Sequence, residues 1–155
     1  MPTVQQLAAE LNSGIIDGLI KNARAVPADK LAWKPLDLGR SVLNQIAECA
    51  VITKWVIKLI ESRDVPELSN EGYADSVAAL EDVNAAVAAL ESAKVELKSV
   101  IETFPSEHLD DQVTLPFFPD PMTFAAIFYI PYWNNTYHIG QICYIQTLLG
   151  DTTSH

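Results

Sequence analysis

Apolar side chains recur every three or four residues along four stretches of this chain, a spacing typical of amphipathic helices. The first stretch predicts a helix over residues 4–25, with Thr3 as its N-cap and Pro27 ending it. The second predicts a helix over residues 41–62, for which Ser41 is a suitable N-cap. The apolar stripe of the first helix consists of Val4, Leu7, Leu11, Ile15 and Leu19.

The other two stretches lie in the second half of the chain. Residues 76–104 contain no Gly or Pro and are rich in Ala, Leu, Glu and Lys, which favours one long helix. Residues 121–149 predict the last helix, with Pro121 in its first turn and Gly150 after its end. Pro131 lies inside this stretch and is expected to kink it, although the sequence leaves open whether a new helix begins there.

The segments between these helices are short and rich in turn-forming residues. The connector over residues 26–40 contains two prolines and a glycine, with room for one short helical turn. Residues 105–120 suggest either a β-hairpin or a loop, and Pro116 and Pro119 favour the loop. Four amphipathic helices without a convincing strand pair predict an all-α fold, a four-helix bundle that forms one domain over residues 1–155.

Charge narrows the range of partners. The chain has 20 acidic and 10 basic side chains, a formal net charge of −10, which opposes binding to nucleic acid or to an anionic membrane surface. There is no apolar run of the ~18 residues that a membrane-spanning helix needs, and no signal peptide pattern at the N-terminus. We therefore expect a cytoplasmic protein, in which Cys49 and Cys143 are free thiols in apolar surroundings.

A few polar residues interrupt the apolar helices and are candidates for chemistry. Asn134 and His138 are four residues apart, so they share one face of the last helix, and Gln141 adjoins them. Glu48 lies between Ala and Cys in the second helix, on the side that should face the core. A carboxylate in that position has to be paired, bound to a metal or protonated.

The order of these residues resembles the DinB-like family, whose members look like four-helix bundles with a metal site made by three histidines. The segment His138-Ile-Gly-Gln141 matches the end of the family's last-helix motif, and residues 41–48 match the second-helix motif with Glu48 in place of histidine. Asn134 stands where the remaining histidine would be. The connector over residues 29–35 and the ending Leu-Leu-Gly-Asp are also similar, so the resemblance extends over nearly the whole chain.

What the resemblance implies is a metal site made of Glu48, Asn134 and His138. Glu and His are good ligands for divalent metals such as zinc, nickel or manganese, whereas Asn is a weak neutral donor. Two alternatives stay open: the same residues form a buried hydrogen-bonded network that fixes helix register, or they form a metal-free ligand or catalytic site.

Two functions of different classes follow. The first is a metal-dependent enzyme acting on a small molecule, a thiol-dependent transferase or a hydrolase as the family resemblance implies, with Glu48 as a ligand or a general base. The second is a non-catalytic bundle with a degenerate metal site, which serves as a small-ligand binder or as a dimeric interaction module. A homodimer is expected on either hypothesis, because the relatives in this family often look dimeric. An enzyme predicts an accessible pocket at Glu48 and His138, and a structural network predicts a closed one.

Overall fold

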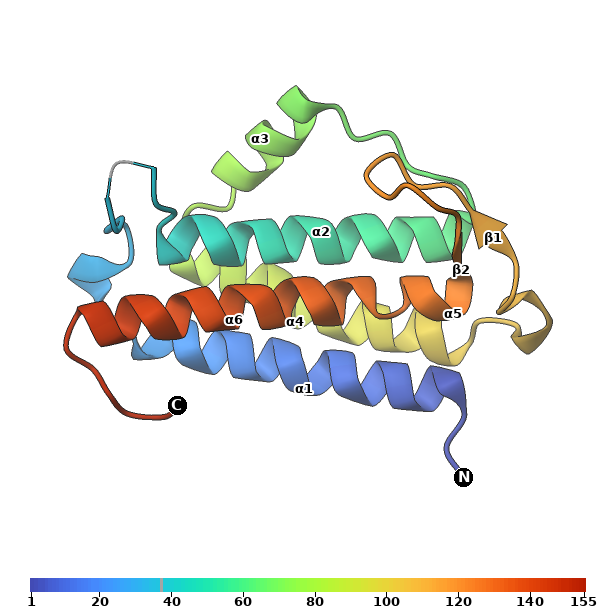
Figure 1. The fold of residues 1–155 in the computed structure, drawn as a ribbon, viewed down its shortest axis with the longest axis horizontal. Helices are drawn as coiled ribbons and strands as arrows, with labels where there is room; N and C mark the ends of the chain where they lie inside the picture. Colours follow the sequence, from blue (N-terminus) through green and yellow to red (C-terminus); the bar gives the residue numbers. More distant parts are fainter. Residues whose placement is uncertain (37) are drawn as a thin grey trace.

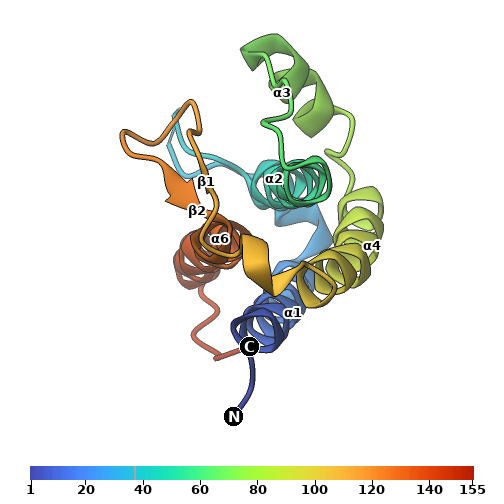
Figure 2. The same ribbon diagram turned by 90° about the vertical axis from the view of Figure 1, so that its right-hand side faces the viewer.

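Four long helices lie side by side and form a bundle, as predicted (Figure 1). The structure is a computed structural model that describes residues 1–36 and 38–155. The helices α1 and α2 each pack against both α4 and α6, so the order around the bundle is α1, α4, α2, α6 (Figure 2). Their bounds are Val4–Ala25 for α1, Val42–Ser62 for α2, Val83–Glu102 for α4 and Ile130–Leu148 for α6.

The ends of the first two helices follow the sequence signals. The Thr3 hydroxyl accepts the backbone N–H of Gln6, and the Gln6 side chain accepts the N–H of Thr3, which completes a capping box. The Ser41 hydroxyl caps α2 in the same way, by accepting the N–H of Asn44. Between the two helices, the expected short turn is a 3₁₀ helix over Ala28–Lys30.

The prediction of a single helix over residues 76–104 was wrong. A separate short helix, α3, spans Asn70–Ala78, and α4 begins only at Val83. The Asp82 carboxylate accepts two backbone N–H groups and so starts a new helix in the middle of a stretch that has no Gly or Pro. Helix α3 stands out from the bundle beside α2, as Figure 2 shows.

The region before the last helix also differs from the prediction. After a 3₁₀ turn at Ser106–His108, strand β1 (Gln112–Val113) pairs in an antiparallel manner with β2 (Met122–Thr123), so the hairpin that the prolines argued against is present. A short helix α5 spans Phe124–Ile127, and α6 then begins at Ile130. Pro131 therefore stands in the first turn of a new helix, where its missing N–H costs little.

A side chain of α1 stabilises the break between α5 and α6. The side-chain amide of buried Asn12 donates to the carbonyl of Phe128 at 2.8 Å and to that of Ala8 at 2.8 Å. A carbonyl released by the break is thus satisfied inside the protein.

The core consists of two apolar clusters, one toward each end of the bundle, with a polar layer between them. The cluster at the hairpin end includes one Trp and three Phe side chains among aliphatic ones, and the cluster at the connector end is aliphatic apart from Cys49. The layer between them holds the buried side chains of Asn12, Asn134, Asn135 and His138. The described helices include none that is long and apolar enough to cross a membrane.

Candidate functional site

The structure brings the predicted residues of α2 and α6 together inside the bundle. Glu48 on α2 faces His138 on α6, with 3.4 Å between Glu48 Oε1 and His138 Nε2. Asn134 lies one helical turn before His138 and is also buried, and its side-chain nitrogen is 3.8 Å from the Sγ atom of Cys49. Asn134 and His138 lie on one face of α6, as their spacing predicts, and the structure places this face inside the bundle.

Arg40 completes the centre, and sequence reasoning missed it. Its guanidinium forms an ion pair with Glu48 Oε2, and its Nε atom donates to the Oδ1 atom of Asn44 at 2.7 Å. Arg40 stands two residues before α2, so it belongs to the connector and lies on no apolar stripe. The available signal was the buried carboxylate itself, which requires a cation, and Arg40 is the basic residue that immediately precedes its helix.

Gln45 was also not predicted from the sequence, and its position shows which ring nitrogen of His138 carries a hydrogen. His138 Nδ1 is 3.1 Å from Gln45 Oε1, while Gln45 Nε2 donates to the backbone carbonyl of Arg40 at 3.3 Å. The Gln45 oxygen is therefore the acceptor and Nδ1 carries a hydrogen. Because Nε2 faces the carboxylate of Glu48, a neutral ring would point a lone pair at a negative oxygen. The pattern fits a ring that donates from both nitrogens, or one with a cation between Nε2 and Glu48.

Positive neighbours keep Glu48 ionised. Burial alone raises the pKa of Glu48, but the hydrogen bonds and charges of His138 and Arg40 outweigh it and lower the pKa to about 2. Burial, together with the charge of Glu48, raises the pKa of the Cys49 thiol well above its ordinary value. The same two causes raise the pKa of Tyr73 on α3 to about 12. Cys49 is thus a thiol in the core and is poorly suited to act as a nucleophile.

The donor set fits a tightly held metal only in part. Two atoms, Glu48 Oε1 and His138 Nε2, have the separation of roughly 3.4 Å that two ligands of a tetrahedral zinc ion have. The third residue, Asn134, offers a weak neutral oxygen, and the Arg40 guanidinium already supplies a positive charge to Glu48. Among residues 1–36 and 38–155, no three His, Cys, Asp or Glu side chains are grouped to hold a metal ion. The residues present thus supply two good ligands for a divalent metal, Glu48 and His138, and one weak ligand, Asn134.

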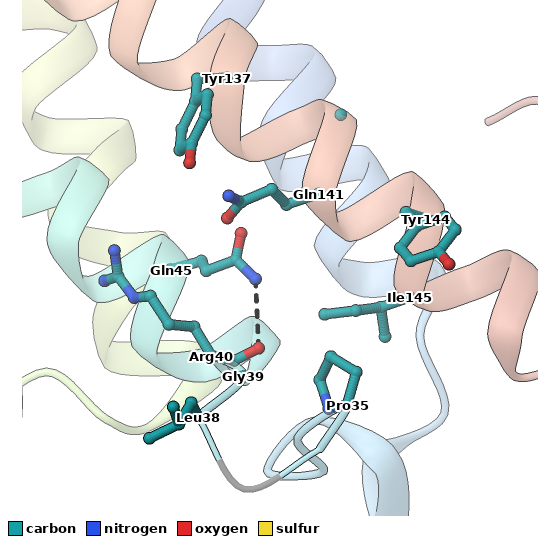
Figure 3. A pocket seen from close by; sticks show the side chains of 10 residues that line it. Pro35, Leu38, Gly39, Arg40, Gln45, Tyr137, Gln141, Tyr144 and Ile145 are labelled. Atoms are coloured by element: carbon teal, nitrogen blue, oxygen red, sulfur yellow. Dashed lines mark hydrogen bonds between the residues drawn. The ribbon is translucent and has the colours of Figure 1, made fainter.

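A cavity of about 580 Å³ opens beside this centre, between the connector, the start of α2 and the second half of α6. Arg40 and Gln45 line it from one side, and Tyr137, Gln141 and Tyr144 from α6. In Figure 3 the side-chain amides of Gln45 and Gln141 face each other, and the Tyr137 hydroxyl points toward them. The remaining lining is formed by Pro35, Leu38, Gly39, Gly140 and Ile145.

The centre itself is nearly closed. The side chain of His138 is 1% exposed and that of Glu48 is 13% exposed. Arg40 also borders a second cavity of about 340 Å³, which Tyr73 of α3 lines from the other side. The pair Glu48–His138 is therefore almost covered, and its partners Arg40 and Gln45 link it to the 580 Å³ cavity.

Comparisons with known proteins agree with the fold. The sequence profile described as the DinB superfamily matches residues 16–142, while no curated protein matches the chain. Among solved structures, the chain is similar to the crystal structure of the mycothiol-dependent maleylpyruvate isomerase, with a TM-score of 0.73 and 12% sequence identity. That match covers 92% of this chain, which spans 63% of the isomerase. Because the superfamily profile covers most of the chain, the protein belongs to the DinB superfamily.

Proposed function

We propose that this member of the DinB superfamily binds a small organic molecule in the 580 Å³ cavity, and that its polar centre serves this site without a resident metal. One observation carries the proposal: both polar residues that form the α2 side of the cavity, Arg40 and Gln45, are bonded to the buried pair Glu48–His138. The centre therefore holds two of the polar groups that a ligand in the cavity meets, while the side chains of Glu48 and His138 are themselves only 13% and 1% exposed.

The lining of the cavity suggests what such a ligand contains. Gln141 and Tyr137 offer an amide and a hydroxyl toward the cavity, and Pro35 and Ile145 offer apolar surface (Figure 3). A molecule with an apolar body and one or two hydrogen-bonding groups complements this lining. The volume is within the range of small-molecule sites, roughly 300–1,000 Å³.

A thermal-shift screen of small amides, alcohols and carboxylic acids tests the proposal. We expect a compound that raises the melting temperature of the wild-type protein, and whose effect is lost in Gln141→Leu. Lys58→Ala is the matched control, since Lys58 lines a different cavity of about 480 Å³ between α2 and the α3 region. A screen without a stabilising compound, or shifts that survive in Gln141→Leu, contradicts the proposal.

A metal-dependent enzyme is the second candidate, and the converging atoms Glu48 Oε1 and His138 Nε2 favour it. In this case Glu48, Asn134 and His138 form the metal site, and the similarity to a mycothiol-dependent isomerase suggests a thiol-dependent reaction. Zinc, nickel or manganese would supply Lewis-acid chemistry when bound.

Metal content of untagged protein, followed by calorimetric titration with these three metals, separates the two candidates. Near-stoichiometric metal that disappears in His138→Ala supports the enzyme. No metal and no binding heat, with His138→Ala losing only stability, supports the metal-free site.

A further inference from the structure

The linker between α2 and α3 forms the roof of a cavity that is separate from the Glu48–His138 centre. Arg63, the residue after α2, has a φ of 60°, in the left-handed region, and the chain then returns over α2 toward α3 (Figure 1). The indole N–H of Trp55 on α2 donates to the carbonyl of Pro66 at 3.1 Å and holds the linker in this place. Helix α3 buries only Val77, so the space beneath it stays partly open.

This space is the cavity of about 480 Å³ between α2, the linker, α3 and α4, which we call the linker cavity. Its lining on α2 runs from Ala50 to Lys58, about 12 Å along the helix. At the Ala50 end, Leu80 and Ala89 complete an apolar wall that packs against the aliphatic cluster. Toward the other end, the side chains from α2 are lysines. The cavity is therefore apolar at one end and charged at the other.

The charge of this lining differs in sign from that of the whole chain. Lys54 and Lys58 are one helical turn apart, and Glu67 is the one acidic residue among the described lining residues. Lys54 Nζ lies 3.3 Å from the Glu96 carboxylate, whereas Lys58 forms no ion pair with any residue in 1–36 or 38–155. In a chain with a net charge of −10, the linker cavity is thus a local region of positive charge.

We propose that the linker cavity binds a small carboxylic acid with an apolar body. The apolar body lies along the wall formed by Ala50, Leu80 and Ala89, and the carboxylate lies at Lys58. The volume is within the range of small-molecule sites, roughly 300–1,000 Å³. Because the linker cavity and the 580 Å³ cavity share no lining residue, this site does not depend on the proposed function.

The roof connects the linker cavity to the candidate site. Ser76 of α3 lines the cavity, and the hydroxyl of Tyr73, one turn earlier on the same helix, lies beside Glu48. A ligand beneath α3 adds contacts to a helix that has little buried surface of its own. We therefore expect bound ligand to slow amide hydrogen exchange in α3, and unchanged exchange there would contradict the proposal.

Nitrogen–proton NMR during a titration with octanoate tests the proposal. The Trp55 indole N–H reports on the linker cavity, because the ring lines the wall and the N–H is bonded to the roof. We expect its signal, identified with Trp55→Phe, to shift until it saturates. The indole signal of Trp133, which lines a different hollow, should stay in place. Octanol lacks the charge and acetate lacks the apolar body, so both should bind about fivefold more weakly or less well still.

Variants of the lining test the charged end. Lys58→Met keeps the length of the side chain and removes its charge, and it should raise the dissociation constant of octanoate about three- to fivefold. Lys98→Met is the matched control, since Lys98 on α4 pairs with Glu102 and does not line the cavity. Glu67→Gln should instead tighten binding, because it removes the one acidic group of the lining.

Ala89→Leu tests the apolar end. The added carbons occupy space that the ligand needs, so the dissociation constant should rise about tenfold or more, while Ala88→Leu, at an exposed position of α4, should bind like the wild type. The proposal is overturned by a Trp55 signal that does not shift, by octanol binding as tightly as octanoate, or by unchanged affinity in Lys58→Met or Ala89→Leu. Compounds that act at the 580 Å³ cavity keep their effect in Lys58→Ala, so either proposal can fail alone.

Discussion

The two ends of the bundle are built from the same four helices but serve different purposes. At the hairpin end, Trp55, Phe104, Phe124 and Phe128 pack into an aromatic cluster that β1, β2 and α5 close. At the connector end, aliphatic residues such as Leu90 form the cluster, and a cavity opens beside them. The polar layer separates the ends, and the ionised residues of the candidate site lie on the connector side.

This difference indicates that stability and binding are largely separate in the molecule. A closed cluster with aromatic side chains contributes packing and buried area, and its polar Trp55 N–H is satisfied by the carbonyl of Pro66 at 3.1 Å. The connector end instead keeps Arg40 and Gln45 at a cavity wall, and it buries Glu48 only because two cationic or donor groups surround it. Substitutions at the two ends should therefore have different signatures.

The largest expected effect is at the aromatic end. Phe128 is fully buried, and its ring lies 5.3 Å from that of Phe104 in an edge-on arrangement. Phe128→Ala should lower the free energy of unfolding by about 3–5 kcal/mol, measured by urea denaturation. Ligand affinity at the cavity should be retained under native conditions, and a loss of less than about 1 kcal/mol would contradict the account.

Glu48→Gln should lower the free energy of unfolding by about 2–3 kcal/mol, the next largest effect. The substitution leaves Arg40 and His138 without their carboxylate. Unlike Phe128→Ala, it should also weaken binding at the cavity, since Arg40 and Gln45 lose the pair that holds them. Denaturation and calorimetry together check both effects. Equal ligand affinity in the wild type and in Glu48→Gln would show that the centre does not influence binding at the cavity.

Lowering the pH should remove the contribution of the Glu48–His138 pair to stability without a mutation. The folded pKa of Glu48 is about 2, below its ordinary value of 4.5, so its contribution is complete above pH ~4.5 and is lost as the pH falls toward 2. The loss amounts to at most about 3 kcal/mol. Stability curves of wild type and Glu48→Gln should therefore converge over this window. Parallel curves would show that Glu48 has an ordinary pKa.

A substitution in the polar layer should raise the stability of the protein instead of lowering it. Asn135 is fully buried on α6, and neither its side-chain oxygen nor its nitrogen has a hydrogen-bond partner among the described residues. Asn135→Leu removes two unsatisfied polar atoms and should raise stability by about 1 kcal/mol. Thermal unfolding measures the change. A destabilisation of similar size would mean that the amide is satisfied by buried water.

The smallest effect concerns α3. The Tyr73 hydroxyl lies beside Glu48, and its pKa is raised to about 12 by burial and by the charge of that carboxylate. Tyr73→Phe should cost about 0.5–1 kcal/mol in stability, measured by urea denaturation, and should leave the bundle intact. An unchanged free energy of unfolding would show that α3 makes no polar contribution to the centre.

Periodicity predicted the existence of the long helices, but the stripe expected on α1 was partly wrong. Val4 and Leu7 are each 43% exposed, because the face of α1 that packs inward runs through smaller residues such as Ala8 and Asn12. Periodicity also failed where a cap or a pairing decided the outcome: Asp82 starts a helix inside an uninterrupted helical pattern, and strand β1 finds its partner β2 across a loop with prolines. Such choices depend on single hydrogen bonds and contacts between distant segments.

The site was predictable only in part. Glu48, Asn134 and His138 were found because they interrupt apolar faces at helical spacing. Arg40 and Tyr73 were missed because both lie outside the bundle helices, one in the connector and one on α3. Their relation to Glu48 depends on tertiary structure, which no spacing in the sequence encodes. The metal-site assignment stays a prediction.

Imidazole nitrogen NMR of His138 tests the central claim most directly. Labelled protein, stripped of metal and held at about pH 7, is compared before and after one equivalent of zinc, with His138→Gln assigning the signal. We expect zinc to leave the signals of both ring nitrogens unchanged, because Nδ1 is held by Gln45 and Nε2 faces the Glu48 carboxylate that Arg40 already neutralises. An Nε2 signal that shifts stoichiometrically with zinc would contradict this expectation and establish the metal site.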